Sequence, residues 1–328
     1  MKPLPTLRTF LQEEGVQGIF IKGDSSIRYF TGFTGGESLL YVDALRAVLI
    51  TDSRYILQAQ QQAPECEILE HQHGLFSVVD QVRPAWRLAL DGDYFSYTEA
   101  TALQKALPKA SFKNVNLVFL RAVKSPEEQR KMFKAAAIAD DAFHELIPHI
   151  KVGRRESELA AELEYNMRKR GAQKTSFDTI VASGVRSALP HGVASNKVIE
   201  EGDFVTFDFG CIYDGYCSDM TRTVVMGKAA PWQKEIYEIV LAANELGEEV
   251  LFPGKTGIEV DQAVRDFIAS KGYGAYFGHG LGHGVGLDIH EKPNLNKGNP
   301  DPIPVGAIVT VEPGPSCNHS MLDYLFIS

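Results

Sequence analysis

The stretch that decides the fold is DFVTFDFGCIYDGYCSDMTRTVVM, residues 203–226. Asp214-Gly215 stands between two runs rich in β-branched and aromatic residues, and this pattern predicts two strands joined by a two-residue turn. Tyr213 then pairs with Tyr216, so each residue before the turn acquires a defined partner after it. The segment is therefore predicted to be a β-hairpin with a fixed register.

This register places two carboxylates on one face of the hairpin. Asp208 faces Thr221 and Gly210 faces Asp219, and residues two apart in a strand share a face. The two aspartates become diagonal neighbours, roughly 7–8 Å apart at the backbone. Arg222 points to the opposite face and cannot neutralise them. Either a hard divalent cation such as Mn²⁺ or Mg²⁺ lies between the carboxylates, or this face is exposed and both carboxylates are hydrated.

A second informative stretch is GHGLGHGVGLDIHE, residues 278–291, which contains His279, His283 and His290. The interleaved glycines remove side chains, so that backbone or ligand can approach closely. Imidazole is the commonest protein metal ligand and the commonest general acid–base group near neutral pH. The cluster predicts a metal or acid–base site, with three structural histidines as the alternative.

Two further candidates stand alone in the sequence. His191 follows the polar turn 183–187, and a structural role explains it as well as a functional one. Glu312 ends the apolar run 307–311, which is predicted to be a buried strand. A carboxylate at the end of a buried strand needs a partner, and a metal would be one.

The first part of the chain, residues 1–122, alternates β-rich and helical stretches, which is typical of a small α/β domain. The β-rich runs are 18–21, 38–42 and 47–51, and the helical stretches are 55–62 and 97–107.

A second domain, residues 123–328, begins at a helix start. Ser125 is a predicted N-cap, Pro126 suits the first helical position, and Glu128 completes a capping box. The helix is predicted to run to about residue 149. Its buried side is predicted to contain Met132, Phe133, Ala136, Ile138, Ala139, Phe143, Leu146 and Ile147. Further helices are predicted at 156–170, 233–251 and 256–270.

Composition excludes several classes of protein. The 328 residues contain 33 Lys plus Arg and 42 Asp plus Glu, a formal charge of −9, which argues against nucleic acid as the main partner. No run approaches the roughly 18 apolar residues of a membrane span, and the N-terminus lacks the apolar region of a signal peptide. The four cysteines form no CxxC pair, so reduced thiols in a cytoplasmic protein are expected.

Together these segments resemble the pita-bread metallopeptidases, in the Xaa-Pro aminopeptidase and prolidase branch. The match rests on an Asp pair eleven residues apart, a Gly-rich histidine motif and Glu312-Pro-Gly314. RYFTGFTG (28–35) and LITDSRY (49–55) resemble the creatinase-type N-terminal domain. The resemblance implies an α+β pita-bread catalytic domain at 123–328, a smaller α/β creatinase-type domain at 1–122, and a homodimer.

The resemblance also implies a role for each candidate residue. Asp208, Asp219, His283 and Glu312 match metal ligands, with Asp219 bridging two divalent ions, for which Mn²⁺ is expected and Co²⁺ or Zn²⁺ are alternatives. His191 and His290 match the histidines that hold the substrate carbonyl and assist proton transfer, and His279 matches a further active-site histidine. A hydroxide bridging the two metals would attack the amide bond before proline.

One position bears on the substrate. Dipeptide-cleaving relatives commonly carry Arg soon after the His-Glu pair, where it can bind the substrate carboxylate. Here the run is His290-Glu-Lys-Pro-Asn294. It favours an aminopeptidase for longer peptides, with an Xaa-Pro dipeptidase as the alternative. The preferred first residue and the native metal stay open.

The sequence departs from the family pattern after Gly314. A last ligand Glu is expected about fourteen residues after Glu312, where Phe326 stands, and residues 313–328 contain no Glu and no Arg. We hypothesise that this tail is out of frame or otherwise replaced, which leaves four of five ligands and weaker binding of both metals. A catalytically impaired relative that binds peptides or proteins is therefore an alternative. A creatinase-like hydrolase is disfavoured, because creatinases dispense with the acidic metal set.

Overall fold

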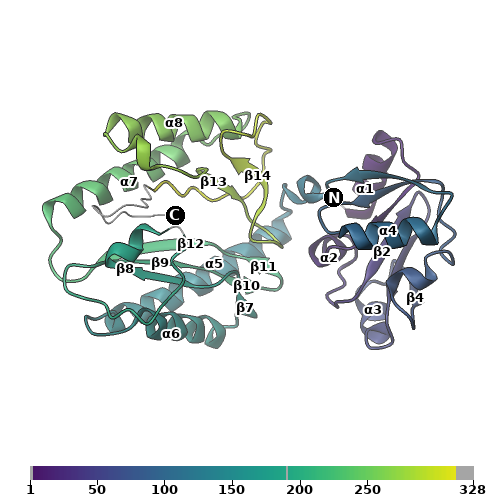
Figure 1. Cartoon of the computed structure of the whole chain (residues 1–328), viewed down its shortest axis with the longest axis horizontal. Coiled ribbons are helices and arrows are strands. Elements are labelled where there is room, and N and C mark those ends of the chain that lie inside the picture. Colours follow the sequence, from purple (N-terminus) through teal and green to yellow (C-terminus); the bar gives the residue numbers. More distant parts are fainter. Residues whose placement is uncertain (1–2, 190, 315–328) are drawn as a thin grey trace. The chain divides into compact units, whose positions relative to one another are not determined.

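The computed structural model describes residues 3–189 and 191–314. The chain divides into two compact units, Met1–Arg121 and Ala122–Ser328 (Figure 1). Each unit has its own hydrophobic core. The predicted alteration of residues 315–328 lies outside the described residues.

The first unit is a six-stranded mixed sheet with helices on both faces, which confirms the predicted α/β character. Its strand order is β4-β3-β2-β1-β5-β6, with β1–β2 and β2–β3 antiparallel and the other pairs parallel. The strands are β1 (Gly18–Ile21), β2 (Leu39–Asp43), β3 (Ala47–Thr51), β4 (Glu67–Glu70), β5 (Arg87–Asp91) and β6 (Ser111–Val115). The helices are α1 (Pro3–Glu13), α2 (Asp24–Thr31), α3 (Ile56–Gln62) and α4 (Tyr97–Ala106), with 3₁₀ turns η1 (Leu75–Val78) and η2 (Val118–Arg121).

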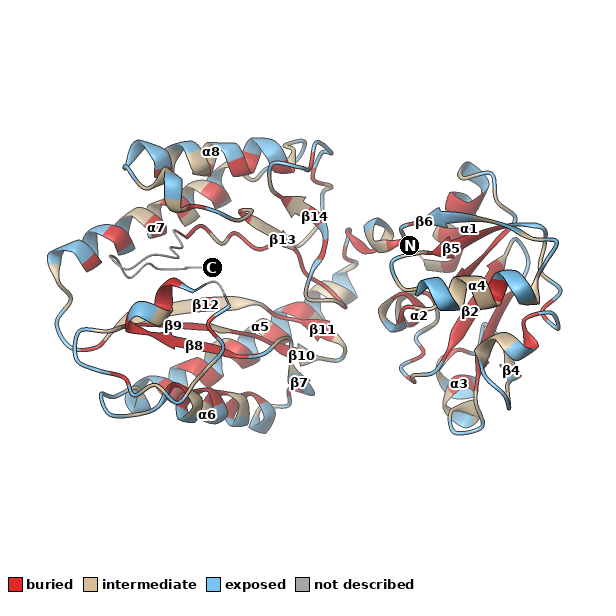
Figure 2. Cartoon of the chain, in the orientation of Figure 1, coloured by how far each residue is buried: buried red, intermediate tan, exposed pale blue. Residues whose placement is uncertain are grey.

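Alternation along the strands builds two cores in this unit. Ile19 and Ile21 of β1 pack in one cluster with residues of α1, α2 and α3. Phe20 packs in the other cluster with residues of η1 and α4. Both faces of the sheet are thereby covered, and the central strands are buried (Figure 2).

The second unit combines four helices with three small sheets among the described residues, as the α+β prediction requires. The sheets have the orders β12-β9-β8, β11-β10-β7 and β13-β14. The helices are α5 (Pro126–Leu146), α6 (Glu156–Lys169), α7 (Pro231–Val250) and α8 (Gly257–Ser270), with 3₁₀ turns η3 (Ile147–His149), η4 (Gly184–Ala188) and η5 (Gly274–Tyr276). The strands are β7 (Lys174–Thr175), β8 (Ile180–Ser183), β9 (Phe204–Phe209), β10 (Cys211–Tyr213), β11 (Tyr216–Cys217), β12 (Met220–Val225), β13 (Gly282–Gly284) and β14 (Glu291–Leu295). Helices α5 and α6 cover one face of β8–β9–β12 (Figure 1). Helices α7 and α8 pack against the segment of β13 and β14, on the side away from β8–β9–β12.

Helix α5 begins as predicted but buries a partly different face. Both hydrogen bonds of the capping box are present, Glu128 N to Ser125 Oγ at 3.3 Å and Ser125 N to Glu128 Oε2 at 2.8 Å. The prediction that Phe133 and Ile147 are buried is wrong, because their exposed fractions are 68% and 46%. Phe133 is one residue, or about 100°, off the buried stripe of a 3.6-residue period. Ile147 lies beyond the helix, in η3. The stripe consists of Met132, Ala135, Ile138, Ala139, Ala142, Phe143 and Leu146.

The predicted hairpin register is confirmed. Tyr213 pairs with Tyr216 and Asp208 pairs with Thr221. Both turn residues have positive φ, 44° at Asp214 and 79° at Gly215, as a type I′ turn requires. Arg222 does point away from the aspartates, and its guanidinium lies 3.4 Å from Asp140 of α5.

The apolar run before Glu312 forms isolated bridges where a regular strand was predicted. Ala307 bridges to Val123, and Val309 bridges to Gly284. Backbone hydrogen bonds nevertheless continue along β13, from Thr310 N to His283 O at 2.8 Å and from Glu312 N to Leu281 O at 2.7 Å. This pairing sets Glu312 beside the histidine motif.

No helix in the described part of the chain has both the length and the apolar character needed to cross a membrane. Cys66, Cys211 and Cys217 are free thiols. The fourth cysteine, Cys317, lies outside the described residues.

Candidate metal centre

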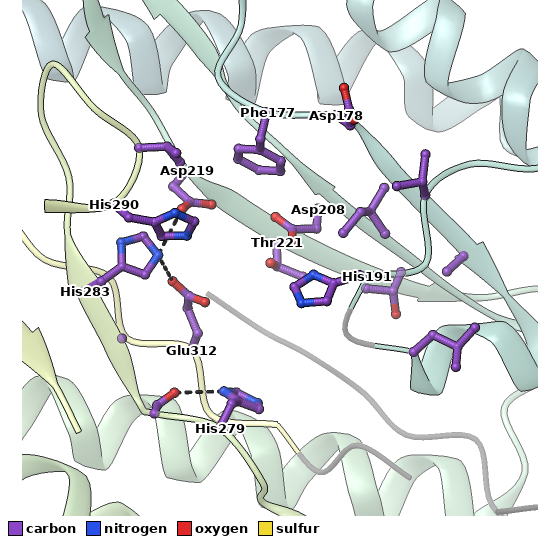
Figure 3. A pocket seen from close by; sticks show the side chains of 18 of the residues that line it. Phe177, Asp178, His191, Asp208, Asp219, Thr221, His279, His283, His290 and Glu312 are labelled. Carbon is purple, nitrogen blue, oxygen red and sulfur yellow. Dashed lines mark hydrogen bonds and ion pairs between the residues drawn. The ribbon is translucent and has the colours of Figure 1, made fainter. Parts of the chain in front are cut away.

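A pocket of about 590 Å³ in the second unit gathers the residues singled out from the sequence (Figure 3). All seven of the predicted site residues line it: His191, Asp208, Asp219, His279, His283, His290 and Glu312. They come from strands and loops far apart in the chain, so the fold and not the local sequence brings them together.

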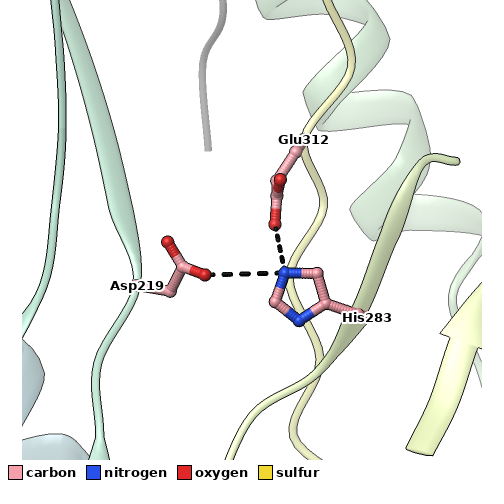
Figure 4. Close-up of side chains that lie close together, drawn as sticks. All are labelled: Asp219, His283 and Glu312. Carbon is pink, nitrogen blue, oxygen red and sulfur yellow. Dashed lines mark ion pairs between the residues drawn. The ribbon is translucent and has the colours of Figure 1, made fainter. Parts of the chain in front are cut away.

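Three of these side chains meet closely enough to hold one ion. Asp219, His283 and Glu312 each offer a ligand atom, and these atoms all lie within 4.8 Å of one another (Figure 4). Nε2 of His283 is 3.3 Å from Glu312 Oε1 and 3.6 Å from Asp219 Oδ2. Nδ1 of His283 donates to the Gly284 carbonyl at 3.0 Å, which leaves Nε2 as the nitrogen facing the carboxylates.

Asp208 lines the same pocket but lies outside this close cluster. It projects from β9, opposite Thr221 of β12, and its Oδ1 is buried without a hydrogen-bond partner among the described residues. A buried carboxylate oxygen without a partner is unfavourable unless a cation balances it.

The electrostatics of the pocket show an excess of negative charge. Burial, followed by the charges of Asp219 and Glu312, raises the pKa of Asp208 well above its usual range. Burial and Glu312 raise the pKa of Asp219 to about 7. Burial by itself would lower the pKa of His283, but the hydrogen bond and charge of Glu312 raise it to about 8. Three carboxylates thus share one imidazole, and such a mutually repelling set of oxygen and nitrogen donors fits a divalent cation.

His290 and His191 contribute imidazoles to the same pocket (Figure 3). The ring centroids of His290 and His283 are 4.4 Å apart in an edge-to-face arrangement. Burial, and then the charge of His283, lowers the pKa of His290, which favours its neutral form. His191 is exposed and stands on the loop that follows η4.

His279 lines the pocket, but both of its ring nitrogens face backbone carbonyls. Nδ1 lies 2.8 Å from the oxygen of Gly280, and Nε2 lies 3.2 Å from the oxygen of Gly314. This histidine therefore holds the backbone close to Glu312.

The glycines around His283 have the steric role expected of them. A Cβ at Gly282 would lie 2.1 Å from the Thr310 oxygen, and one at Gly284 would lie 2.4 Å from the Lys292 oxygen. Only glycine allows the backbone on either side of His283 to pass this close to its neighbours.

Sequence reasoning missed a buried ion pair beside the site. Lys124 Nζ lies 3.1 Å from Glu291 Oε2, and both side chains are 1% exposed. Glu291 also accepts a hydrogen bond from Asp288 N at 3.2 Å, next to His290. No local pattern could pair two residues so distant in the sequence. Phe177, Asp178 and Ile289 also line the pocket and carry no motif.

Known proteins share this architecture over nearly the whole chain. The Xaa-Pro dipeptidase of Pyrococcus furiosus is 39% identical over 315 residues, which is 95% of this chain and 89% of that protein. The structure of an Xaa-Pro dipeptidase from Bacillus anthracis is 44% identical, with a TM-score of 0.94 over 100% of this chain and 93% of the other. An X-Pro aminopeptidase structure from Thermotoga maritima MSB8 is 38% identical, with a TM-score of 0.90 over 98% and 92%.

The fold and the acidic, histidine-bearing pocket thus define a pita-bread metallopeptidase with a creatinase-type first unit. Residues 3–122 match the creatinase/prolidase N-terminal domain, and residues 130–320 match metallopeptidase family M24. The chain belongs to metallopeptidase family M24.

Proposed function

We propose that this chain is a metal-dependent aminopeptidase that hydrolyses the bond between an N-terminal residue and a following proline. The observation that carries the proposal is the convergence of Asp219, His283 and Glu312, with Asp208 beside them, in one pocket. The Xaa-Pro specificity is supported by the relatives, which are named Xaa-Pro dipeptidase and X-Pro aminopeptidase.

Asp208, Asp219, His283 and Glu312 would hold the metal, with Mn²⁺ as the expected ion. When bound, divalent ions at such a site supply Lewis-acid activation of water and of the substrate carbonyl. The carboxylates of the pocket also attract the ammonium group at the substrate N-terminus.

Two of the pocket histidines, His290 and His191, would act at the peptide bond that is cleaved. A neutral His290 can donate one N–H toward the oxygen on which negative charge develops, where a fixed donor lowers the barrier. His191 would assist proton transfer to the departing nitrogen of proline. The apolar side chains of Phe177, Val193 and Ile289 suit a proline ring.

A longer peptide suits the pocket better than a dipeptide. Among the described residues that line it, none is Lys or Arg, so no cationic side chain awaits a free carboxylate close to the scissile bond. Xaa-Pro dipeptide hydrolysis is the second candidate, favoured by similarity to the Bacillus anthracis protein, which is 44% identical and is named Xaa-Pro dipeptidase. A non-catalytic peptide-binding relative is the third, because residues 313–328 contain no Glu.

Hydrolysis of Ala-Pro-Ala and Ala-Pro by the Mn²⁺-loaded full chain separates these functions. We expect release of alanine from the tripeptide at a higher kcat/KM, with loss on chelation and in His290→Ala. Faster cleavage of the dipeptide would establish the second function. Tripeptide binding without turnover, with Mn²⁺, Co²⁺ and Zn²⁺ each tested, would establish the third.

A further inference from the structure

The His191 imidazole depends on its loop for its position. The loop runs from Ser183, at the end of β8, to Ser195, and it carries η4 in between. His191 is exposed, and within the described chain no hydrogen bond is formed by its ring. Its backbone oxygen accepts from Val193 N at 2.9 Å, so the loop turns tightly at this residue. Where the ring lies is therefore set by what fixes the two ends of the loop.

The buried carboxylate of Glu156 binds both ends of this loop. Glu156 opens helix α6 and is 0% exposed. Its Oε1 accepts from the backbone N and the Oγ of Ser183, at 2.7 and 2.8 Å. Its Oε2 accepts from the backbone N and the Oγ of Ser195, at 3.1 and 2.6 Å. The carboxylate thus joins the residue where the loop leaves the sheet to the residue where the loop ends.

Two cations reinforce this junction. Arg186 donates through Nε to Glu156 Oε2 at 3.1 Å and through Nη2 to the Val193 oxygen at 2.7 Å. The Arg186 side chain therefore links residue 186 to Val193 across the loop, and His191 lies between these two residues in the chain. Lys197 Nζ donates to Ser183 Oγ at 2.9 Å and lies 2.7 Å from Asp203 Oδ2.

Stability alone does not explain a carboxylate in this position. A buried, charged network is often no more stable than apolar side chains of the same volume, whereas it does select a single geometry. The N-terminus of α6 favours the negative charge, and five donors satisfy it. Displacing a catalytic group by about 1 Å can lower a rate by about 100-fold.

We infer that Glu156 is a positioning residue, which fixes the described loop residues 184–189 and 191–194 so that the His191 imidazole stands at the wall of the metal pocket. This inference rests on the proposed function, in which His191 acts on the substrate. Glu156 itself does not line the pocket, so it acts through the loop.

Glu156→Gln tests the inference, because it keeps the shape while replacing one acceptor oxygen with a donor. Asp91→Asn, the same change at a carboxylate that is 0% exposed in the first unit, is the matched control. We expect amide hydrogen exchange in residues 184–189 and 191–195 to accelerate by about tenfold or more in Glu156→Gln. We expect no change there in Asp91→Asn, and unchanged Mn²⁺ stoichiometry in both variants. We also expect kcat for Ala-Pro-Ala to fall by about tenfold or more.

A double-mutant cycle separates positioning from general damage. In a His191→Ala background, Glu156→Gln should lower kcat by less than about twofold, because the two residues act as one unit. An equal loss in both backgrounds, or wild-type exchange rates in the loop, would overturn the inference.

Arg186→Met keeps the test decisive if Glu156→Gln does not fold. It removes the link across the loop while leaving the buried carboxylate bound by the two serines. The same faster exchange and the same dependence on His191 are expected, and their absence would contradict the inference. If the wild-type chain cleaves no peptide, the proposed function fails, whereas loop exchange in these variants still decides whether Glu156 fixes the loop.

Discussion

The sheets of the two units differ in what covers their faces. In the first unit, β1 to β3 are packed on both faces, and their side chains alternate between two apolar clusters. In the second unit, β9 packs Phe207 and Phe209 against Phe143 of α5, while Asp208 on its other face lines the pocket. The same alternation thus builds a closed layer in one unit and one wall of the pocket in the other. The proposed chemistry lies where a sheet face carries carboxylates in place of a packed helix.

The strongest test of this contrast removes charge from the open face. Asp219→Asn should lower metal affinity by at least about 100-fold, because it changes a proposed ligand directly. Mutation of a residue that only hydrogen-bonds to a metal ligand already lowers affinity by up to about 100-fold. Calorimetric titration with Mn²⁺ measures this loss. Asp140→Asn, on α5 and away from the pocket, is the matched control and should bind Mn²⁺ like the wild type. Equal affinities in both variants would show that the open face does not bind metal.

The packed face should respond through stability. Phe207→Ala removes a fully buried ring that contacts Phe143 at a centroid distance of 5.3 Å, and we expect a loss of about 3–5 kcal/mol in the free energy of unfolding. Phe133→Ala, on the exposed side of α5, should change it by no more than about 0.5 kcal/mol. Urea denaturation measures both variants. A similar loss in both would mean that the buried stripe of α5 is wrongly assigned.

A buried carboxylate in the closed sheet of the first unit should make stability depend on pH. Burial raises the pKa of Asp91 to about 6, although Ser26 and Arg121 act in the opposite direction. A raised carboxyl pKa contributes stability that is fully present below the unfolded value of 3.8 and is lost as pH rises through about 6. The first unit should therefore be destabilised across this window, by at most about 1.4 kcal/mol for each unit of pKa shift.

Asp91→Asn should abolish that dependence. Thermal unfolding of both proteins between pH 4 and pH 7 is the measurement, and parallel curves for wild type and variant would exclude the effect.

The smallest change in stability is expected for a substitution at Arg222, on the side of β12 that faces helix α5. Arg222 forms a half-exposed ion pair with Asp140, and Arg222→Met should cost about 0–1 kcal/mol of stability. Peptide turnover should stay at the wild-type value, because Arg222 points away from the pocket. A clear fall in kcat would imply that this guanidinium does reach the aspartates.

Local rules predicted much of this arrangement. The period of two and the Asp214-Gly215 turn were sufficient to pair Asp208 with Thr221 and to direct Arg222 elsewhere. The capping box at Ser125 located the start of α5. The edge strands β4 and β6 escaped prediction, since their side chains are largely exposed and lack an apolar period.

The features that could not be predicted from the sequence depend on contacts between segments that are far apart in the chain. Glu312 approaches His283 because residues 308–312 pair with 281–285, a register that no turn residue specifies. Glu156 looks like an ordinary acidic residue in the first turn of a helix, since its partners at Ser183 and Ser195 become neighbours only after folding. The prediction for Phe133 was wrong because neighbouring residues in a helix lie about 100° apart, so Met132 is buried while Phe133 is exposed.

At Gly282 and Gly284 the absence of a side chain sets the distance between neighbouring backbone segments. A methyl group at either position would press on a backbone oxygen of the neighbouring segment, at 2.1 or 2.4 Å. Relief would require His283 to move relative to Glu312 or Lys292, which would widen the gap between the donors. A library that randomises both codons and selects for metal retention should therefore return glycine at both positions, even though neither residue would touch the ion.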